Sequence, residues 1–359
     1  MPRKVSHTIP FDCGFPLFVP TGIKSYLIKL QKIRVSDIWG FWDYIIKIHS
    51  LKRGKISGNF LPTLLEQAKY FYQAAETAPM KSQPLLYYYS FLNIAKIVIN
   101  LKYPLGKGVE YYHGIETKVT DATTLKTAEV SFKQYGGIGS TKISVAKEFL
   151  TILGDSIVVP NVTKIEDLLS SCVGIHRTYS ETFNKKETFY RLENSTNIER
   201  SGKKISYESK VRGINEQLMQ DLINAKGYNI RKEGSGESKK FLFREEMNMI
   251  DYTMAPIRWK LFANQIMAKG IWSYTDGDNY RMFISKEALP MSPASIIYSI
   301  MFFFGSITRY NPYFFESILN AKEQWLVSEF LRTQPKQFMY MVTSMMVGNY
   351  IYNSKTVNL

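Results

Sequence analysis

Residues 82–99 read SQPLLYYYSFLNIAKIVI, and residues 298–312 read YSIMFFFGSITRYNP. Both stretches are apolar and aromatic over a length that is typical of a buried helix. Each also carries one cation, Lys96 in the first and Arg309 in the second. A buried cation needs a partner or a ligand. We therefore predict two helices that lie side by side with polar groups between them.

Two interpretations of these cations are open. A long cationic side chain can extend along its helix until the charge reaches water. Alternatively, the polar side chains converge in the interior of a helical bundle, where they would complete a hydrogen-bond network or hold a phosphate. The second interpretation makes four residues candidates for ligand binding: Asn93, Lys96, Arg309 and Tyr310.

Helical patterns stand on both sides of a region rich in strand patterns. Residues 61–78 and 84–101 show helical periodicity with a proline in the first turn, and their short connection predicts an antiparallel helical hairpin. Helical periodicity returns at residues 144–153 and 165–172. From Ser292 the pattern is helical to the end of the chain. Two prolines are expected to mark joints in that last part: Pro312 and Pro335.

Polar and apolar residues alternate within the region between these helices, as in half-buried strands. The segment Asp276-Gly277-Asp278-Asn279 predicts a hairpin turn rather than a calcium loop, because the downstream calcium ligands are missing. The strand patterns occupy residues 189–193, 204–208, 228–231, 241–244, 272–274 and 280–284.

The length of 359 residues exceeds what one compact core usually holds. We predict a mainly α fold, in which a helical bundle scaffold carries an inserted small β-rich module, so that the protein is α+β overall. The predicted parts are a basic N-terminal segment (1–60), the first part of a helical domain (61–182), the β-rich insertion (183–290) and C-terminal helices that complete the helical domain (291–359).

The chain is basic. Its net charge is +15, and residues 1–60 hold ten basic side chains against three acidic ones. Such an excess favours a polyanionic partner bound through a basic face: a nucleic acid (RNA or DNA), a nucleotide or an acidic protein. A basic amphipathic helix is expected at about residues 21–33. The alternative is a solvated, lysine-rich surface without a partner. The binding candidates here are Lys24, Lys29, Lys32 and Arg34.

Two histidines are further candidates for contact with an anionic substrate. His176 and Arg177 follow an apolar helix, and His113 precedes a glycine at an expected loop. Structural roles are the alternative for both histidines. No histidine or cysteine pair has zinc-ligand spacing, and residues 136–142 fail the spacing of a phosphate-binding loop. We predict no metal site, no cofactor and no recognisable catalytic motif.

The two cysteines lie far apart in the sequence and fit a reducing compartment. The first residues have no apolar core of the kind that a secretory signal needs, and no stretch reaches the ~18 apolar residues that span a bilayer. We expect a cytoplasmic protein that does not bind a membrane.

Four segments carry a resemblance to the YaaC-like bacterial proteins. Residues 84–96 (PLLYYYSFLNIAK) resemble the signature helix of that family, and residues 304–312 (FGSITRYNP) are similar to its C-terminal block. His113-Gly114-Ile115 and residues 165–169, which lead into Tyr179, resemble its middle part. The family implies no assigned activity.

The helix at residues 82–99 also resembles, more loosely, the tyrosine-rich helix of HEPN (higher eukaryotes and prokaryotes nucleotide-binding) domains. These domains occur in ribonucleases of toxin and phage-defence systems. Such nucleases carry an arginine and a following histidine with four to six residues between them, and this chain has no such pair. The resemblance therefore implies binding rather than cleavage.

Three functions follow as hypotheses. The first is a nucleic-acid- or nucleotide-binding component, within a phage-defence system, that does not catalyse. The second is a non-enzymatic scaffold or interaction subunit that binds a protein partner or itself, which Trp39, Trp42 and the final helices suggest. Trp39, Trp42 and Tyr44 form a packing or docking cluster. The third is a ribonuclease or nucleotide hydrolase without the usual Arg/His motif.

Overall fold

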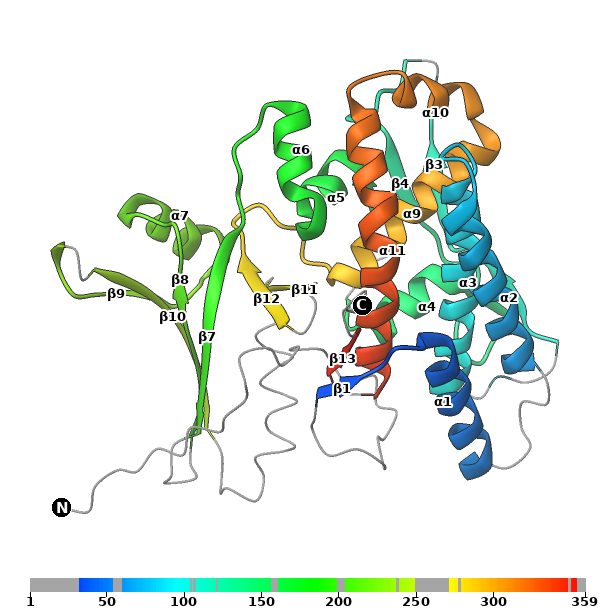
Figure 1. Ribbon diagram of the computed structural model, residues 1–359, viewed down its shortest axis with the longest axis horizontal. Helices are drawn as coiled ribbons and strands as arrows, with labels where there is room; N and C mark the ends of the chain where they lie inside the picture. The colour runs from blue at the N-terminus through cyan, green and yellow to red at the C-terminus, as the bar shows by residue number, and fades with distance from the viewer. Residues whose placement is uncertain are drawn as a thin grey trace, which may run out of the picture.

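The structure is a computed structural model and contains helices together with several sheets (Figure 1). It is mainly helical, as the sequence predicts, with additional β structure. The residues that it describes are 32–53, 60–103, 105, 108–120, 122–155, 161–198, 204–236, 239–248, 271–276, 279–347 and 350–353.

Helices α2 (Phe60–Thr77) and α3 (Gln83–Lys102) form the predicted pair. Pro62 and Pro84 stand in their first turns, where a missing N–H costs no helical hydrogen bond. Helix α2 buries Leu61, Leu64, Leu65, Ala68 and Ala75. The hydroxyl of Ser90 on α3 donates to the carbonyl of Ala68 on α2 (2.8 Å), so that a buried polar group is satisfied across the interface.

Helix α9 (Pro293–Tyr310) packs along α3, and the prediction that these two helices lie side by side is confirmed. All of its residues from Pro293 to Ile307 are buried. Gly305 marks the closest approach. A Cβ atom at this position would lie 2.9 Å from the Cβ of Tyr88 and 3.2 Å from the carbonyl oxygen of Pro84. Only glycine allows this distance between the two helices.

A buried carboxyl group fixes the start of α9. Asp155 follows α4 (Val145–Ile152) and accepts hydrogen bonds from the backbone N–H (2.8 Å) and the hydroxyl (3.2 Å) of Ser292, the N-cap residue. Burial raises the pKa of Asp155 to about 6, although its hydrogen bonds with Ser295 and Ser292 act in the opposite direction. The N-cap of α9 is therefore tied to the end of α4.

Other helices surround α3 and α9. They are α1 (Ile38–Arg53), α5 (Ile165–Ser171), a 3-10 turn (Val173–Ile175), α6 (His176–Phe183), α10 (Pro312–Leu319) and α11 (Glu323–Val347). The fully buried indole of Trp42 on α1 donates to the hydroxyl of Thr343 on α11 (2.8 Å). The ring of Phe91 stacks on Phe338 at 3.8 Å, which joins α3 to α11.

Several expectations for the ends of the chain are wrong. Pro335 lies inside α11 and marks no joint, whereas Pro312 does begin α10. The C-terminal part is not helical to its end, because Tyr350–Tyr352 forms strand β13, which pairs in parallel with β1 (Lys32–Arg34). Backbone pairing thus replaces the helix expected at residues 32 and 33. The rest of that expected helix lies outside the described residues.

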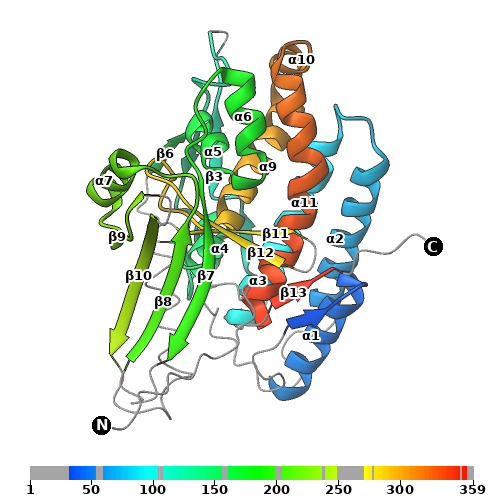
Figure 2. The ribbon, with the colours of Figure 1, turned by 60° about the vertical axis from the view of Figure 1, so that its left-hand side comes forward.

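A six-stranded sheet contains all the strand patterns predicted between residues 189 and 284. Its order is β11 (Trp272–Asp276), β12 (Asn279–Ile284), β7 (Tyr190–Ile198), β8 (Lys204–Val211), β10 (Lys240–Asn248) and β9 (Ile230–Glu233), and all of its pairs are antiparallel (Figure 2). The hairpin predicted at residues 276–279 is confirmed, since Asp276 pairs with Asn279.

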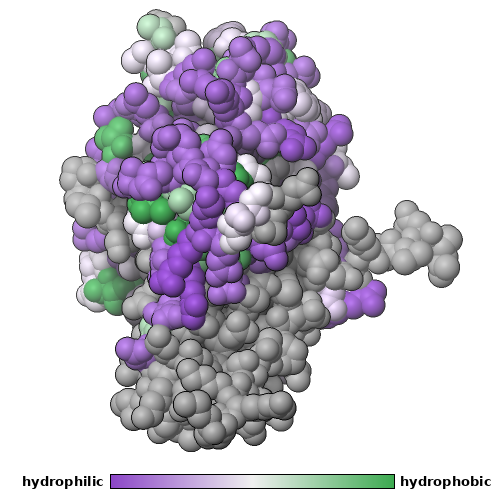
Figure 3. All heavy atoms as spheres, turned by 90° about the vertical axis from the view of Figure 1, so that its left-hand side faces the viewer, coloured by the Kyte–Doolittle hydropathy of each residue, from purple (hydrophilic) through white to green (hydrophobic). Residues whose placement is uncertain are grey.

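The sheet forms one side of the molecule, together with α7 (Glu216–Lys226) (Figure 1). Its own core includes Leu222 of α7 with Tyr228 and Phe243, separate from the larger helical core. Figure 3 faces this side, where the described residues are mostly hydrophilic and the apolar ones form small scattered groups.

Two small sheets lie next to α3 and α9. Strand β2 (Glu110–Tyr112) pairs in parallel with β5 (Lys142–Ser144). Strands β3 (Ile115–Lys118), β4 (Glu129–Phe132) and β6 (Asn161–Lys164) form an antiparallel sheet in the order β3-β4-β6. The segment from Glu110 to Lys118 therefore passes beside the helix pair and brings polar side chains to it.

The contact between α3 and α9 predicts the effect of Gly305→Ala. In an unobstructed helix this change stabilises by about 1 kcal/mol. Here the added methyl group would overlap Tyr88, so we expect the free energy of unfolding to fall by about 1–3 kcal/mol in urea denaturation followed by circular dichroism. Ser317→Ala, at an exposed position of α10, is the control and should change it by less than about 0.5 kcal/mol. A stabilised Gly305→Ala variant would contradict the close approach.

Candidate functional site

A cavity of about 390 Å³ opens between α3, α9 and the segment that runs from β2 into β3. Helix α3 contributes Leu85, Tyr88 and Tyr89, and α9 contributes Phe302, Gly305, Ser306, Arg309 and Tyr310. His113, Ile115, Glu116, Thr117 and Asn311 complete the lining. We call this cavity the α3–α9 pocket. Its lining combines aromatic rings with hydroxyl, carboxylate, imidazole and guanidinium groups, a mixture that is typical of ligand sites.

His113 stands at the turn between β2 and β3, where Gly114 adopts a positive φ of 71°. Its Nδ1 atom makes a short hydrogen bond with the hydroxyl of Tyr88, and the two rings lie 5.5 Å apart. The pKa of His113 lies below its ordinary value of 6.5, first because of burial and then because of the positive charges of Lys96 and Arg309. The imidazole is therefore mostly neutral at pH 7.

Arg309 lies in the last turn of α9, at the mouth of the pocket. Its Nη1 atom donates to the hydroxyl of Tyr89 (2.7 Å), and its guanidinium carbon lies 4.9 Å from the centre of the Tyr310 ring. Tyr310 is itself 66% exposed. The neighbouring aromatic groups hold the guanidinium in place without neutralising its charge.

Lys96 is half-buried two turns beyond Tyr88 on α3 and does not line the pocket. Its ammonium group lies 5.5 Å from the centre of the Tyr111 ring, and burial lowers its pKa. Neither Lys96 nor Arg309 forms an ion pair within the described part of the chain. Two cations thus act on one imidazole, and neither is paired with a carboxylate of a described residue.

The structure separates Asn93 from this group. Its Nδ2 atom donates to Oε1 of Gln67 (3.4 Å), so the side chain faces α2 rather than the pocket. Of the four residues expected to converge, Arg309 and Tyr310 line the pocket, Lys96 lies behind it, and Asn93 belongs to the interface between α2 and α3.

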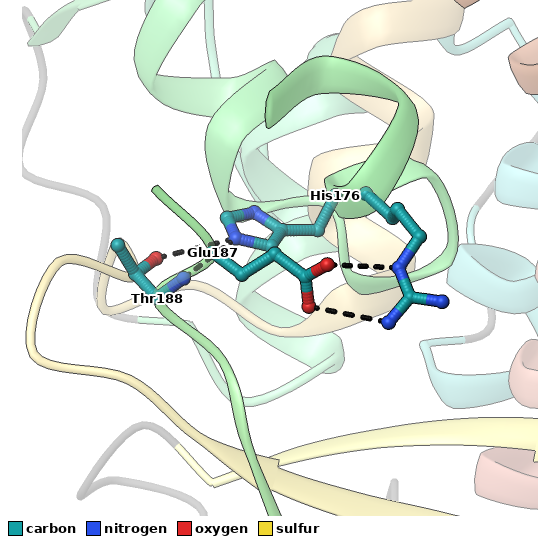
Figure 4. Close-up of polar contacts among 4 residues, drawn as sticks. His176, Glu187 and Thr188 are labelled. Atoms are coloured by element: carbon teal, nitrogen blue, oxygen red, sulfur yellow. Dashed lines mark hydrogen bonds and ion pairs between the residues drawn. The ribbon is translucent and has the colours of Figure 1, made fainter. Parts of the chain in front are cut away.

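His176 is buried and both of its ring nitrogens are engaged. Figure 4 shows the contacts of Nε2 with Thr188. Nε2 accepts the backbone N–H of Thr188 (2.9 Å), so Nδ1 carries the proton and donates to the carbonyl of Ser170 (2.7 Å). Burial lowers the pKa of His176, although the Ser170 carbonyl and the carboxylates of Glu187 and Glu287 act against this shift. The imidazole ties the start of α6 to the segment that enters β7, which is a structural role.

Arg177 forms an exposed ion pair with Glu187 (2.8 Å). The candidate cluster at residues 176–179 therefore provides no open site: Tyr179 also uses its hydroxyl, which donates to Glu166 (3.2 Å).

The basic N-terminal candidates are only partly described. Lys24 and Lys29 lie outside the described residues. Lys32 and Arg34 belong to β1, and Arg34 is exposed. Among the aromatic residues of α1, Trp42 is fully buried and Trp39 packs edge-on against Tyr72 at 5.5 Å, whereas Tyr44 is 48% exposed. Packing, rather than docking, accounts for the two tryptophans.

Sequence reasoning did not single out Tyr88, Tyr89, Ser306, Thr117 or Glu116 as site residues. A signal was available for the first two, because residues 85, 88, 89 and 92 share one helical face with Lys96. No comparable signal in the sequence indicates that the β2–β3 segment passes this face.

Among the residues that the structure describes, no three His, Cys, Asp or Glu side chains gather as a metal site would require. No described helix is long and apolar enough to cross a membrane.

Fold and site together define a mainly helical protein with a polar, aromatic pocket at the contact of two buried helices. A family model described as YaaC-like Protein matches residues 42–346, which is most of the chain. The chain therefore belongs to the YaaC-like family, and the resemblance seen in the sequence is confirmed. No curated protein gives a significant match. The same holds for solved structures.

The hydrogen bonds of His176 predict a dependence of stability on pH. Because its pKa in the folded state lies below the ordinary value of 6.5, its contribution is fully present above about pH 6.5 and is lost as the pH falls below that value. We expect the stability advantage of the wild type over His176→Gln to shrink between about pH 7.5 and pH 5 in urea denaturation. Asp155, present in both proteins, cancels from the difference. Parallel pH profiles would contradict the prediction.

Proposed function

We propose that this protein binds a nucleotide, either free or within a nucleic acid strand, in the α3–α9 pocket, and that it does so without catalysis. The observation that carries the proposal is the position of Arg309 in the pocket lining together with His113, where this guanidinium forms no ion pair with any described residue. Lys96, behind the pocket, adds a second positive charge that acts on His113. A phosphate would supply the missing negative charge. Arg309 offers the planar fork of N–H groups that matches phosphate oxygens.

The other lining groups support a nucleotide rather than a simple inorganic anion. The volume of about 390 Å³ lies within the range of sites for organic ligands. Tyr310 presents an exposed ring on which a base can stack. Thr117 and Ser306, whose hydroxyls lie 2.9 Å apart, and Asn311 offer polar partners for a base edge or a ribose.

This proposal moves the binding site away from the basic N-terminal segment. Of the four residues proposed there, only Arg34 has a described side chain, and it is exposed on β1. The net charge of +15 remains a reason to expect attraction between the whole protein and polyanions. The likeness of α3 to HEPN helices, the phage-defence setting and the cytoplasmic location stay predictions.

The test measures binding of labelled nucleoside mono-, di- and triphosphates by fluorescence anisotropy, for the wild type and for Arg309→Gln. Loss of a charged hydrogen bond to phosphate should weaken binding at least about tenfold, or about 1.5 kcal/mol. His113→Gln should also weaken it. Higher salt should weaken the wild type more than Arg309→Gln, because the variant makes one phosphate contact fewer.

Arg332→Gln, at an exposed position of α11 outside the pocket, is the charge-matched control and should bind as the wild type does. The proposal fails if Arg309→Gln and Arg332→Gln have the same effect. Incubation with labelled RNA belongs to the same series: products formed by the wild type but not by His113→Gln would favour the ribonuclease hypothesis over pure binding.

An interaction subunit is the second candidate function. It is favoured by exposed aromatic side chains near the start of the C-terminal helices, where Tyr313 is 88% and Trp325 50% exposed. Size-exclusion chromatography with light scattering should then give a mass above the 41.5 kDa of one chain, and Tyr313→Ser should reduce it. A single-chain mass at every concentration would count against self-association.

A further inference from the structure

A pair of stacked tyrosines lies directly beside the α3–α9 pocket. Tyr112 is the last residue of β2, and Tyr135 lies in the connection from β4 to β5. Their rings are 5.4 Å apart and nearly parallel, with 29° between the planes. Successive side chains of a strand point to opposite faces, so Tyr112 points away from its neighbours Tyr111 and His113, which contact α3.

Tyr135 is exposed but held firmly. Tyr135 is 43% exposed, yet its backbone N–H donates to the buried hydroxyl of Ser144 (2.6 Å). Its own hydroxyl makes a short hydrogen bond to the carboxylate of Glu116, which lines the pocket. An aromatic ring fixed in this way loses little conformational entropy when a flat ligand stacks on it.

Two lysines accompany the tyrosine pair. The ammonium of Lys142 lies 5.6 Å from the centre of the Tyr112 ring, and that of Lys133 lies 3.5 Å from Glu116. The connection is held against β5, since a Cβ atom on Gly136 would lie only 2.1 Å from the carbonyl oxygen of Lys142. Glu116 is thus offset by a neighbouring cation, and Lys142 has no ion pair within the described residues.

We infer that the ligand is a single strand of nucleic acid that extends out of the pocket across Tyr135. This inference rests on the proposed function and names its substrate class. One nucleotide occupies the α3–α9 pocket with its phosphate on Arg309, the adjacent base stacks on Tyr135, and Lys142 contacts the next phosphate. Aromatic platforms interleaved with cations bind single strands, because unpaired bases expose the faces that pairing and stacking cover in a duplex.

The experiment uses the full chain and labelled oligonucleotides of one, two, four and eight residues, as RNA and as DNA, in anisotropy titrations. Affinity should rise from the mononucleotide to the tetranucleotide. Tyr135→Leu leaves an apolar side chain packed against Tyr112 but removes both the stacking ring and the hydroxyl that contacts Glu116, whereas Tyr135→Phe removes only that hydroxyl. Tetranucleotide affinity should be about tenfold lower for Tyr135→Leu than for Tyr135→Phe. The two variants should bind the mononucleotide equally, because both lack the hydroxyl and only the ring distinguishes them.

Lys142→Gln provides a second, independent variant. It removes one phosphate contact, so the slope of log affinity against log salt concentration for the tetranucleotide should become shallower by about one. The matched control is Tyr70→Leu, since Tyr70 is a 59% exposed tyrosine whose hydroxyl also donates to a glutamate, Glu66 (2.9 Å), outside the pocket lining. It should leave binding unchanged.

The outcomes separate the two proposals. If mononucleotides bind through Arg309 but longer strands bind no more tightly, the strand path is overturned and the pocket stands. Equal losses for Tyr135→Leu and Tyr70→Leu would also overturn the strand path. If neither mononucleotides nor strands bind, both proposals fail. Tighter binding of a duplex than of either single strand would overturn the substrate class alone. A preference between RNA and DNA identifies which single strand the site accepts.

Discussion

The close approach of α3 and α9 at Gly305 is the constraint on which the rest of the structure depends. Their backbones come so near that a single methyl group would overlap Tyr88. Such proximity excludes water over most of the interface, and α9 is buried from Pro293 to Ile307. A polar group buried there costs free energy unless it has a partner or the interface opens. Asp155 with Ser292 satisfies the first condition, and the pocket beside Arg309 satisfies the second.

The β2–β3 segment brings His113 and Glu116 to this opening, and these side chains set the electrostatics of the pocket. His113 reaches Tyr88 on α3, so the imidazole lies within the fields of Lys96 and Arg309. The carboxylate of Glu116 also lines the pocket, but Lys133 and the hydroxyl of Tyr135 compensate for it. The excess of positive charge is therefore local to the helix contact, and it does not require the basic N-terminal segment.

The sequence predicted those features that local patterns encode. Helical periodicity located α2, α3, α4 and α5, and alternation located all six strands of the large sheet. Sequence patterns gave wrong predictions where contacts with residues far away in the sequence determine the local structure. Pro335 remains helical within α11, and Tyr350–Tyr352 becomes a strand through pairing with β1. Lys96 and Arg309 stood out in the sequence, but Asn93 turned towards α2, a direction that only packing determines.

The two candidate histidines show why titration alone does not identify a functional site. Burial is the first cause of the lowered pKa in both. In His176 the backbone N–H of Thr188 and the carbonyl of Ser170 occupy both ring nitrogens, and the charged neighbours Glu187 and Glu287 raise the pKa. In His113 the charged neighbours are Lys96 and Arg309, which lower it. An anion bound beside His113 would remove that repulsion, whereas the same anion beside His176 would meet carboxylates. The sign of the charge around each imidazole, not the size of its pKa shift, distinguishes His113 in the pocket from His176 in its structural role.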